Sequence, residues 1–448
     1  MVARIRLLDR RAGTERTGLR PRRPGIRAFD VAIVGLGYVG LPLAREAASA
    51  GLRVLGYDVD SQLIDNLNSG RSQVDDVSDE DLRSMLARAF HPTSEVSDLG
   101  DADAIVVCVP TPLTGDNAPD LDAVISAAEV ISGALQPGML VVLESTTYPG
   151  TTEEVFCPIL ERGSGLRAGH DFHVAFSPER IDPGNARFGL ADIPKVVGGI
   201  TPASTDRAIA FYRRFIGTVV AAKGPREAEM AKLLENTYRY VNIALINEMA
   251  IFCNELDIDV WDAIACASSK PFGFQPFYPG PGVGGHCIPI DPIYLSYRFQ
   301  RLGRPCRFIE LARDVNVRMP DYVLSRAIDL LNREGKALNG STVLLLGVTY
   351  KADISDQRES PALPLARRLL ARSATVVYHD PYVPAWSVDG RPMLLTEDLA
   401  AGLNSADLTI LLQQHSAYDP AALAREARLL LDTRGQLRHL ASRTVHVL

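Results

Sequence analysis

Cys287 is the residue whose setting best suits covalent chemistry. It follows the glycine-rich run 280–285 and His286, and Asp291 stands four residues after it. So many glycines before a thiol indicate that the backbone passes close to another group, and a thiol on a tight loop suits attack on a carbonyl carbon. His286 either lowers the pKa of this thiol or anchors the loop backbone, and we favour the second role. The other five cysteines are expected to be small buried hydrophobic residues.

Further polar residues are candidates for the same site. Lys232 and Asn236 stand four apart, with Arg239 three further on, so a helical pattern over residues 226–266 places them on one face among apolar neighbours. Such a stripe either lines a cleft or faces solvent. Glu179 directly follows an apolar strand, where it is either a positioned carboxylate or a salt-bridged helix cap.

A dinucleotide site is predicted near the start of the chain. The glycine-rich run 35–40 follows an apolar strand over residues 31–34 and opens a helix, so that a pyrophosphate can approach the free N–H groups of the helix N-terminus. The next strand ends in Asp58, whose carboxylate can bind the ribose of NAD and would repel the extra phosphate of NADP. We therefore predict NAD as the cofactor, with contacts from Gly35, Gly37, Tyr38, Val39, Gly40 and Asp58.

Small polar residues and cations stand at other strand ends. Pro110 and Thr111 follow one predicted strand, and Thr146 follows another. Because ligands bind at the carboxyl ends of parallel strands, these residues should face one crevice, although isolated threonines are often ordinary loop caps. Later in the chain Tyr350–Lys351 follow a strand and Arg358 precedes a helix. Cationic groups there can hold phosphates, with surface ion pairing as the alternative.

Composition narrows the class of protein. With 448 residues, 46% of them hydrophobic, the chain should fold into two or three domains. A net charge of −7 argues against a nucleic-acid partner. The six cysteines and eight histidines show no ligand or disulfide spacing, so we predict no metal and a reduced, cytoplasmic setting. Residues 1–28 are rich in arginine without an apolar stretch, which predicts a disordered tail rather than a transit peptide, a signal peptide or a membrane contact.

The order of apolar runs predicts an α/β fold of two doubly wound, Rossmann-like domains joined by a long central helical segment. Strands are expected at 31–34, 53–57, 104–109, 140–144 and 172–176, and again at 342–346, 375–378, 408–412 and 444–447. The predicted parts are the tail over 1–28, an NAD-binding domain over 29–212, a central helical domain with the cysteine loop over 213–318, and a sugar-nucleotide-binding domain over 319–448.

These features resemble the UDP-glucose/GDP-mannose dehydrogenase family from about residue 30 to the C-terminus. The resemblance is carried by the segments 141–154 (VVLESTTYPGTTEE) and 270–274 (KPFGF) and by the Cys287 loop. These motifs are similar to those of the UDP-N-acetylglucosamine 6-dehydrogenase branch. The resemblance implies an N-terminal NAD domain, a helical linker often used for dimerisation, and a C-terminal domain that holds a nucleoside-diphosphate sugar. A homodimer is expected on this analogy alone.

The resemblance also implies a role for each candidate residue. The catalytic residues that it implies are Cys287 as thiol nucleophile, Lys232 as active-site lysine, Asp291 as the partner that orients a base or water, Glu179 as the carboxylate of thioester hydrolysis, Asn236 as a sugar-contacting amide, and Thr146 beside the nicotinamide. Arg358 would reach the cofactor from the other domain. Substrate contacts are expected from Glu179, Lys232, Asn236, Tyr278, Gly282, Gly284, Tyr350 and Lys351.

The reaction that follows from these roles is a four-electron oxidation. Converting CH2OH to a carboxylate uses two NAD in succession, and a cysteine can hold the aldehyde as a thiohemiacetal and then as a thioester. Whether Lys232 or Asp291 is the base stays open. The predicted substrate is a UDP-N-acetylhexosamine, because the motifs resemble that branch of the family. The loop 277–282 differs from that of glucose-specific members, and their substrate-binding arginine has no clear counterpart here. The alternatives are a UDP- or TDP-glucose 6-dehydrogenase for antibiotic sugars, a two-electron β-hydroxyacid dehydrogenase, and a catalytically silent NAD-binding scaffold.

Overall fold

The N-terminal domain is built on an eight-stranded sheet with the strand order β3-β2-β1-β4-β5-β6-β7-β8. The computed structural model describes residues 27–448 apart from 75, 116 and 182–188, so the tail predicted over residues 1–28 lies outside the described residues except for its last two. The strands are β1 (Phe29–Val34), β2 (Val54–Tyr57), β3 (Phe90–Thr93), β4 (Ala102–Val107), β5 (Leu140–Leu143), β6 (His173–Phe176), β7 (Lys195–Gly199) and β8 (Val219–Ala221).

Helices cover both faces of this sheet, as a doubly wound fold requires. Side chains of α1, α2, α3 and α6 pack on one face, and side chains of α4 and α5 pack on the other. The central strands β2 and β5 are covered on both sides and bury every residue, which explains why they were visible as apolar runs. The helices are α1 (Gly40–Ser49), α2 (Ser61–Asn68), α3 (Asp79–Arg88), η1 (Val96–Asp101), α4 (Asp122–Ala134), η2 (Thr152–Phe156), α5 (Cys157–Ser164), η3 (Leu190–Asp192) and α6 (Pro202–Tyr212).

One strand pair departs from the predicted parallel arrangement. β6 and β7 run antiparallel, with Ala175 opposite Gly199 and Phe176 opposite Gly198. The other neighbouring pairs of the sheet are parallel. Because β7 runs in the opposite direction, its first residue, Lys195, lies beside the end of β6. In a parallel arrangement Lys195 would lie beside the start of β6.

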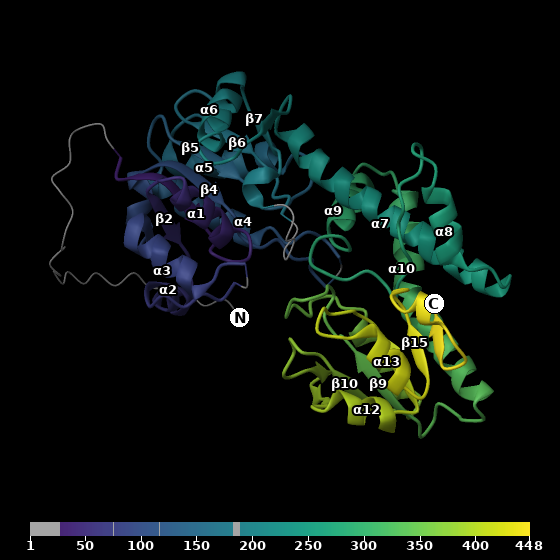
Figure 1. The fold of residues 1–448 in the computed structure, drawn as a ribbon. Coiled ribbons are helices and arrows are strands. Elements are labelled where there is room, and N and C mark those ends of the chain that lie inside the picture. Colours follow the sequence, from purple (N-terminus) through teal and green to yellow (C-terminus); the bar gives the residue numbers. More distant parts are fainter. Residues whose placement is uncertain (1–26, 75, 116, 182–188) are drawn as a thin grey trace.

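The central part confirms the predicted long helical pattern but divides it. α7 (Pro225–Glu255) ends just before Asp257, whose positive φ of 58° leaves the helical region, and α8 (Val260–Ser268) begins after Asp259, whose carboxylate caps it. α9 (Asp291–Arg301) and α10 (Arg307–Arg333) pack against α7, and Figure 1 shows α10 continuing into the C-terminal lobe. α10 passes the predicted boundary at 318/319 without a break. Among the described residues, none of the helices is long and apolar enough to span a bilayer.

The C-terminal domain confirms the second predicted α/β unit. Its six-stranded parallel sheet has the order β13-β10-β9-β14-β15-β16. The second half of α10 and α11 pack on one face of this sheet, and α12 and α13 pack on the other. The elements are β9 (Thr342–Leu346), α11 (Ala362–Ala371), β10 (Thr375–His379), the hairpin β11 (Ser387–Val388) and β12 (Arg391–Pro392), β13 (Leu394–Leu395), α12 (Leu399–Ser405), β14 (Leu408–Leu411), α13 (Pro420–Glu426), β15 (Leu430–Asp432), η4 (Arg438–Leu440) and β16 (Val445–Val447).

Candidate active site

The turn between β1 and α1 has the shape of a dinucleotide site. A Cβ on Gly40 would lie 1.8 Å from the carbonyl oxygen of Gly35, so the turn can close only with glycine there. Gly37 has open space around the same position, which leaves room for a phosphate at the N-terminus of α1. Asp58 at the end of β2 accepts hydrogen bonds from the backbone N–H of Leu36 at 2.9 Å and of Asp60 at 3.0 Å, which fixes its carboxylate beside the turn. These residues fit NAD.

The loops after β4 and β5 close the other side of this crevice. The Thr111 hydroxyl donates to the carbonyl oxygen of Thr146 at 2.8 Å, so the two predicted cofactor residues are brought together. Tyr294 of α9 donates its hydroxyl hydrogen to the Thr111 carbonyl oxygen. Because α9 begins at Asp291, this bond ties the cofactor crevice to the cysteine loop.

The glycines before Cys287 are explained by close packing against the C-terminal domain. A Cβ on Gly284 would lie 2.7 Å from the carbonyl oxygen of Glu359, and one on Gly285 would lie 2.8 Å from the ring of Tyr350. Gly282 and Gly285 have φ values of 137° and 90°, which favour glycine. The backbone N–H of Gly285 also donates to the carbonyl oxygen of Arg358 at 3.1 Å. The inference that this backbone passes close to another group is therefore correct.

Arg358 joins the two nucleotide-binding regions. Its guanidinium lies 5.1 Å from the ring centroid of Tyr38, in the cofactor turn of the N-terminal domain, and makes a bidentate ion pair with Asp356. Its backbone carbonyl meets the cysteine loop through Gly285. This arginine thus extends from the C-terminal domain to the cofactor turn, where the resemblance expects it.

Four candidate catalytic residues gather where the cysteine loop meets α7. Cys287 is exposed, whereas Asp291, Lys232 and Asn236 are buried. The Asn236 amide donates to the Asp291 carboxylate at 2.5 Å. Burial raises the pKa of Asp291 to about 6, and Lys232 and the Asn236 hydrogen bond oppose this rise. The predicted stripe on α7 therefore faces a site, except that Arg239 is exposed because it falls at the margin of the buried face.

Cys287 is an exposed residue, but its thiol is not activated in the free protein. Surrounding protein raises its pKa by desolvation, Asp291 adds to the rise, and Lys232 and Arg358 oppose it. His286 is not a source of positive charge here, because burial and then Arg358 lower its own pKa. Cys287 therefore needs a neighbouring base when it attacks a carbonyl carbon.

Glu179 is held firmly at the end of β6. One carboxylate oxygen accepts hydrogen bonds from the backbone N–H groups of Arg180 and Ile181, each at 2.5 Å, and the other lies 3.3 Å from the Nζ of Lys195. Lys195 also donates to the buried carboxylate of Glu144 at 2.8 Å. The sequence prediction missed Lys195 and Glu144, since an isolated lysine before an apolar run carries no signal of its own.

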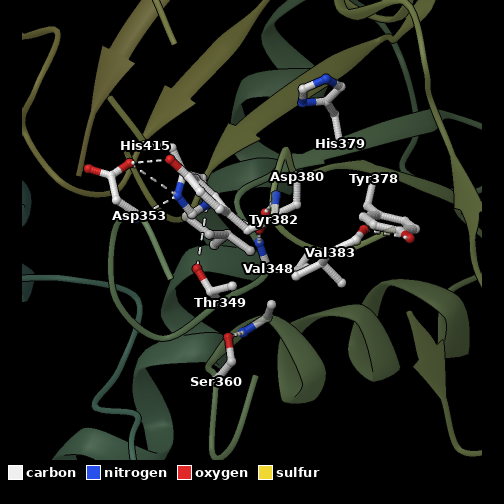
Figure 2. Close-up of polar contacts among 12 residues, drawn as sticks. Val348, Thr349, Asp353, Ser360, Tyr378, His379, Asp380, Tyr382, Val383 and His415 are labelled. Carbon is white, nitrogen blue, oxygen red and sulfur yellow. Dashed lines mark hydrogen bonds and ion pairs between the residues drawn. The ribbon is translucent and has the colours of Figure 1, made fainter. Parts of the chain in front are cut away.

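A buried polar cluster holds the loop that carries Tyr350 and Arg358. Figure 2 shows His415 between Asp353 of this loop and Asp380 at the end of β10. His415 Nδ1 accepts the backbone N–H of Asp353 at 3.0 Å, so Nε2 carries the proton and donates to Asp380 at 3.1 Å. Asp380 also accepts the backbone N–H of Val348 at 2.7 Å. The loop is thus anchored at two points to the carboxyl edge of the C-terminal sheet.

Tyr278 lies apart from these contacts. Its exposed ring stacks on Trp261 of α8 with centroids 5.8 Å apart, so its predicted contact with substrate stays a prediction. Across the described ranges, no group of three or more His, Cys, Asp or Glu side chains is arranged to hold a metal ion.

Comparisons with known proteins agree with this architecture. Models of the UDP-glucose/GDP-mannose dehydrogenase family match residues 29–216 (NAD binding domain), 226–318 (central domain) and 344–439 (UDP binding domain). UDP-N-acetyl-D-glucosamine 6-dehydrogenase of Salmonella typhi is 39% identical over 365 residues, 81% of this chain and 85% of the relative. NDP-N-acetyl-D-galactosaminuronic acid dehydrogenase of Ralstonia solanacearum is 35% identical over 422 residues, 90% of this chain and 95% of that protein.

A solved structure supports the same assignment. The UDP-D-ManNAc dehydrogenase of Pyrococcus horikoshii superposes with a TM-score of 0.83 at 32% identity and covers 93% of this chain and 98% of its own. The matched NAD-binding domain confirms NAD as the cofactor. The chain therefore belongs to the UDP-glucose/GDP-mannose dehydrogenase family and is a nucleotide-sugar dehydrogenase.

Proposed function

We propose that the protein oxidises the C6 hydroxymethyl group of a UDP-N-acetylhexosamine to a carboxylate. The observation that carries the proposal is the exposed residue Cys287 beside the buried group of Asp291, Lys232 and Asn236. A two-electron alcohol dehydrogenase has no need of such a thiol, whereas oxidation to an acid needs a way to retain the aldehyde. The relatives named above act on N-acetylated sugar nucleotides, which favours this sugar class over glucose.

The cofactor would be held by the Gly35–Gly40 turn, Asp58, Thr111 and Arg358. When bound there, NAD accepts the hydride in each of two successive oxidations. Lys232 and Asp291 are the groups placed to take up the proton of the sugar alcohol, and Asn236 holds the Asp291 carboxylate in place through its amide.

Cys287 acts after the first oxidation. Its sulfur bonds to the aldehyde carbon, and its proton passes through Lys232 or Asp291 to the former carbonyl oxygen, which gives a thiohemiacetal. The second oxidation removes a hydride from carbon and the proton from that oxygen, leaving a thioester. Water then attacks the thioester carbon, with Glu179 accepting a proton from the water. The carbon–sulfur bond breaks, the carboxylate leaves, and Cys287 takes back a proton.

The test measures NADH released per molecule of UDP-N-acetylglucosamine, UDP-glucose, TDP-glucose and GDP-mannose. We expect two NADH per molecule of the UDP-N-acetylhexosamine and slower turnover of the others.

Cys287→Ser should bind NAD and the sugar nucleotide with normal affinity but make no acid. Cys306→Ser is the matched control, because Cys306 lies at the N-cap of α10. Preference for UDP- or TDP-glucose would overturn the proposed sugar, and normal turnover of Cys287→Ser would overturn the covalent step. No NADH with any sugar nucleotide, together with insensitivity to iodoacetamide, would favour a silent scaffold.

A further inference from the structure

A buried ionic cluster lies behind Glu179, on the NAD-binding domain. Its members are Lys195, Glu144 and Tyr212, and the side chains of Lys195 and Glu144 are only 5% and 0% exposed. Lys195 Nζ lies 2.8 Å from the Glu144 carboxylate and 3.3 Å from that of Glu179. The Tyr212 hydroxyl donates to the second oxygen of Glu144. Burying an isolated charge costs free energy, so the burial of these charged side chains calls for an explanation.

The antiparallel strand pair explains how the cluster forms. β6 ends at Phe176 opposite Gly198 of β7, and the Ser177 hydroxyl donates to the Val196 carbonyl oxygen at 2.8 Å. Continuing the antiparallel register brings Lys195, the first residue of β7, beside Glu179. Glu144 directly follows β5, the neighbour of β6. The reversal of strand direction between β6 and β7 therefore places a lysine at this edge.

The charges in the cluster favour an ionised lysine. Burial opposes the charge of Lys195, but Glu144 and then Glu179 raise its pKa well above the ordinary value. Desolvation raises the pKa of Glu144, and Lys195 opposes that rise. These carboxylates favour the charged form of Lys195, which pairs with Glu144 and contacts Glu179. The Lys195 ammonium group thus places a positive charge beside the Glu179 carboxylate.

Both oxygens of Glu179 are consequently fixed. One is bound by two backbone N–H groups and the other by Lys195. Glu179 is also close enough to Cys287 to contribute to the raised pKa of that thiol. A carboxylate held in this way can select one orientation for a water molecule beside the sulfur.

We propose that Lys195 is a positioning residue for release of the product acid. This role rests on the function proposed above. Lys195 holds Glu179 in the orientation that accepts a proton from the attacking water. In that step a carbon–oxygen bond forms, the carbon–sulfur bond to Cys287 breaks, and one water proton passes to Glu179. The two oxidations depend on Lys232, Asn236 and Asp291, so they continue when Lys195 is lost.

The test follows NADH formation and the mass of the intact protein after rapid mixing with NAD and UDP-N-acetylglucosamine. In Lys195→Met we expect a first burst of two NADH per site at near-normal rate, steady turnover lowered on the order of tenfold to a hundredfold, and an acyl adduct that accumulates on Cys287. Lys195→Arg should restore part of the turnover, because it keeps the charge but not the geometry. Lys336→Met is the control, since Lys336 pairs with Asp407 on the surface of the C-terminal domain.

A double variant that removes both buried charges controls for loss of the fold. Lys195→Met alone leaves Glu144 as an unpaired buried carboxylate, so Glu144→Gln/Lys195→Met is measured beside it, with NAD binding as the check of folding. A folded double variant that turns over normally, or that slows without an adduct, overturns the inference. Glu179→Gln separates the two proposals. If it accumulates the adduct and the Lys195 variants do not, only the inference on Lys195 fails. If Glu179→Gln turns over normally, the proposed role of Glu179 itself fails.

Discussion

At the scale of single residues, Asp291 should set the acidic limb of the reaction. Its pKa is raised to about 6 by burial. A carboxylate accepts a proton only when it is ionised, so kcat/KM should be low below this pKa, rise as pH passes through about 6, and level off above it. Initial rates at low concentrations of the sugar nucleotide, measured across this range, test the prediction.

The variant Asp291→Asn tests whether Asp291 is the group that causes the acidic limb of kcat/KM. It keeps the size of the side chain, and we expect it to lower kcat/KM on the order of a hundredfold at neutral pH and to remove the acidic limb. Asp314→Asn, on the neighbouring helix α10, should leave kcat/KM and its acidic limb unchanged. An Asp291→Asn protein that keeps the acidic limb would show that another group titrates there.

The residues that could be predicted from the sequence are those with a local pattern. Cys287 stands out by its glycines, Asp58 by its distance from a glycine turn, and Lys232 with Asn236 by their helical spacing. Lys195 has no such pattern, because its role arises only when β7 pairs with β6 in the antiparallel sense. The same limit applies to His415, which meets Asp353 across 62 residues of sequence.

At the scale of elements, the loop between β9 and α11 depends for its position on a few polar contacts. It carries Tyr350 and Arg358 toward the cysteine loop and the cofactor turn, and Figure 2 shows its Asp353 bound to His415. Asp353 has a positive φ of 61°, a conformation that costs energy for a residue other than glycine. The contacts to His415 and Ser416 therefore hold the loop in a shape that it would not keep alone.

His415→Ala should accordingly loosen this loop. We expect KM for the sugar nucleotide and for NAD to rise by about tenfold while kcat changes less, because binding contacts are lost rather than the reacting groups. Asp380→Asn, which keeps its size, should shift KM in the same direction. His439→Ala is the control, as His439 is exposed in the same domain. Unchanged KM values in a folded His415→Ala protein would show that the loop holds without this cluster.

The strands could be predicted from the sequence where their buried residues form an unbroken apolar run. The strands β9 and β1 match their apolar runs within two residues, since the last four residues of each strand are apolar and buried. β3 and β7 were missed because they are short and carry polar or glycine residues, and β8 was missed because it has only three residues. The break between α7 and α8 was missed because two aspartates, not a proline or glycine, make it.

At the scale of the whole molecule, α7 presents an apolar stripe to solvent. Leu234, Tyr238, Leu245, Phe252 and Leu256 recur at helical spacing and are 47% to 69% exposed. The opposite face of the same helix carries Lys232 and Asn236 into the site. A continuous exposed stripe of this size is uncommon on a monomer and marks a surface for association. The face is self-complementary if two copies of α7 meet about a two-fold axis, which is the commonest symmetry of homodimers.

We therefore predict a homodimer in which α7 of one copy packs against α7 of a second. Light scattering after size exclusion should give about twice the chain mass of 48.7 kDa. Leu245→Asp with Phe252→Asp should give the monomer, because two buried carboxylates in an apolar interface have no partners. Leu394→Asp, at an equally exposed leucine of the C-terminal domain, should remain a dimer. Since Lys232 and Asn236 lie on the same helix, dissociation should also lower kcat, and a double variant that stays dimeric would place the interface elsewhere.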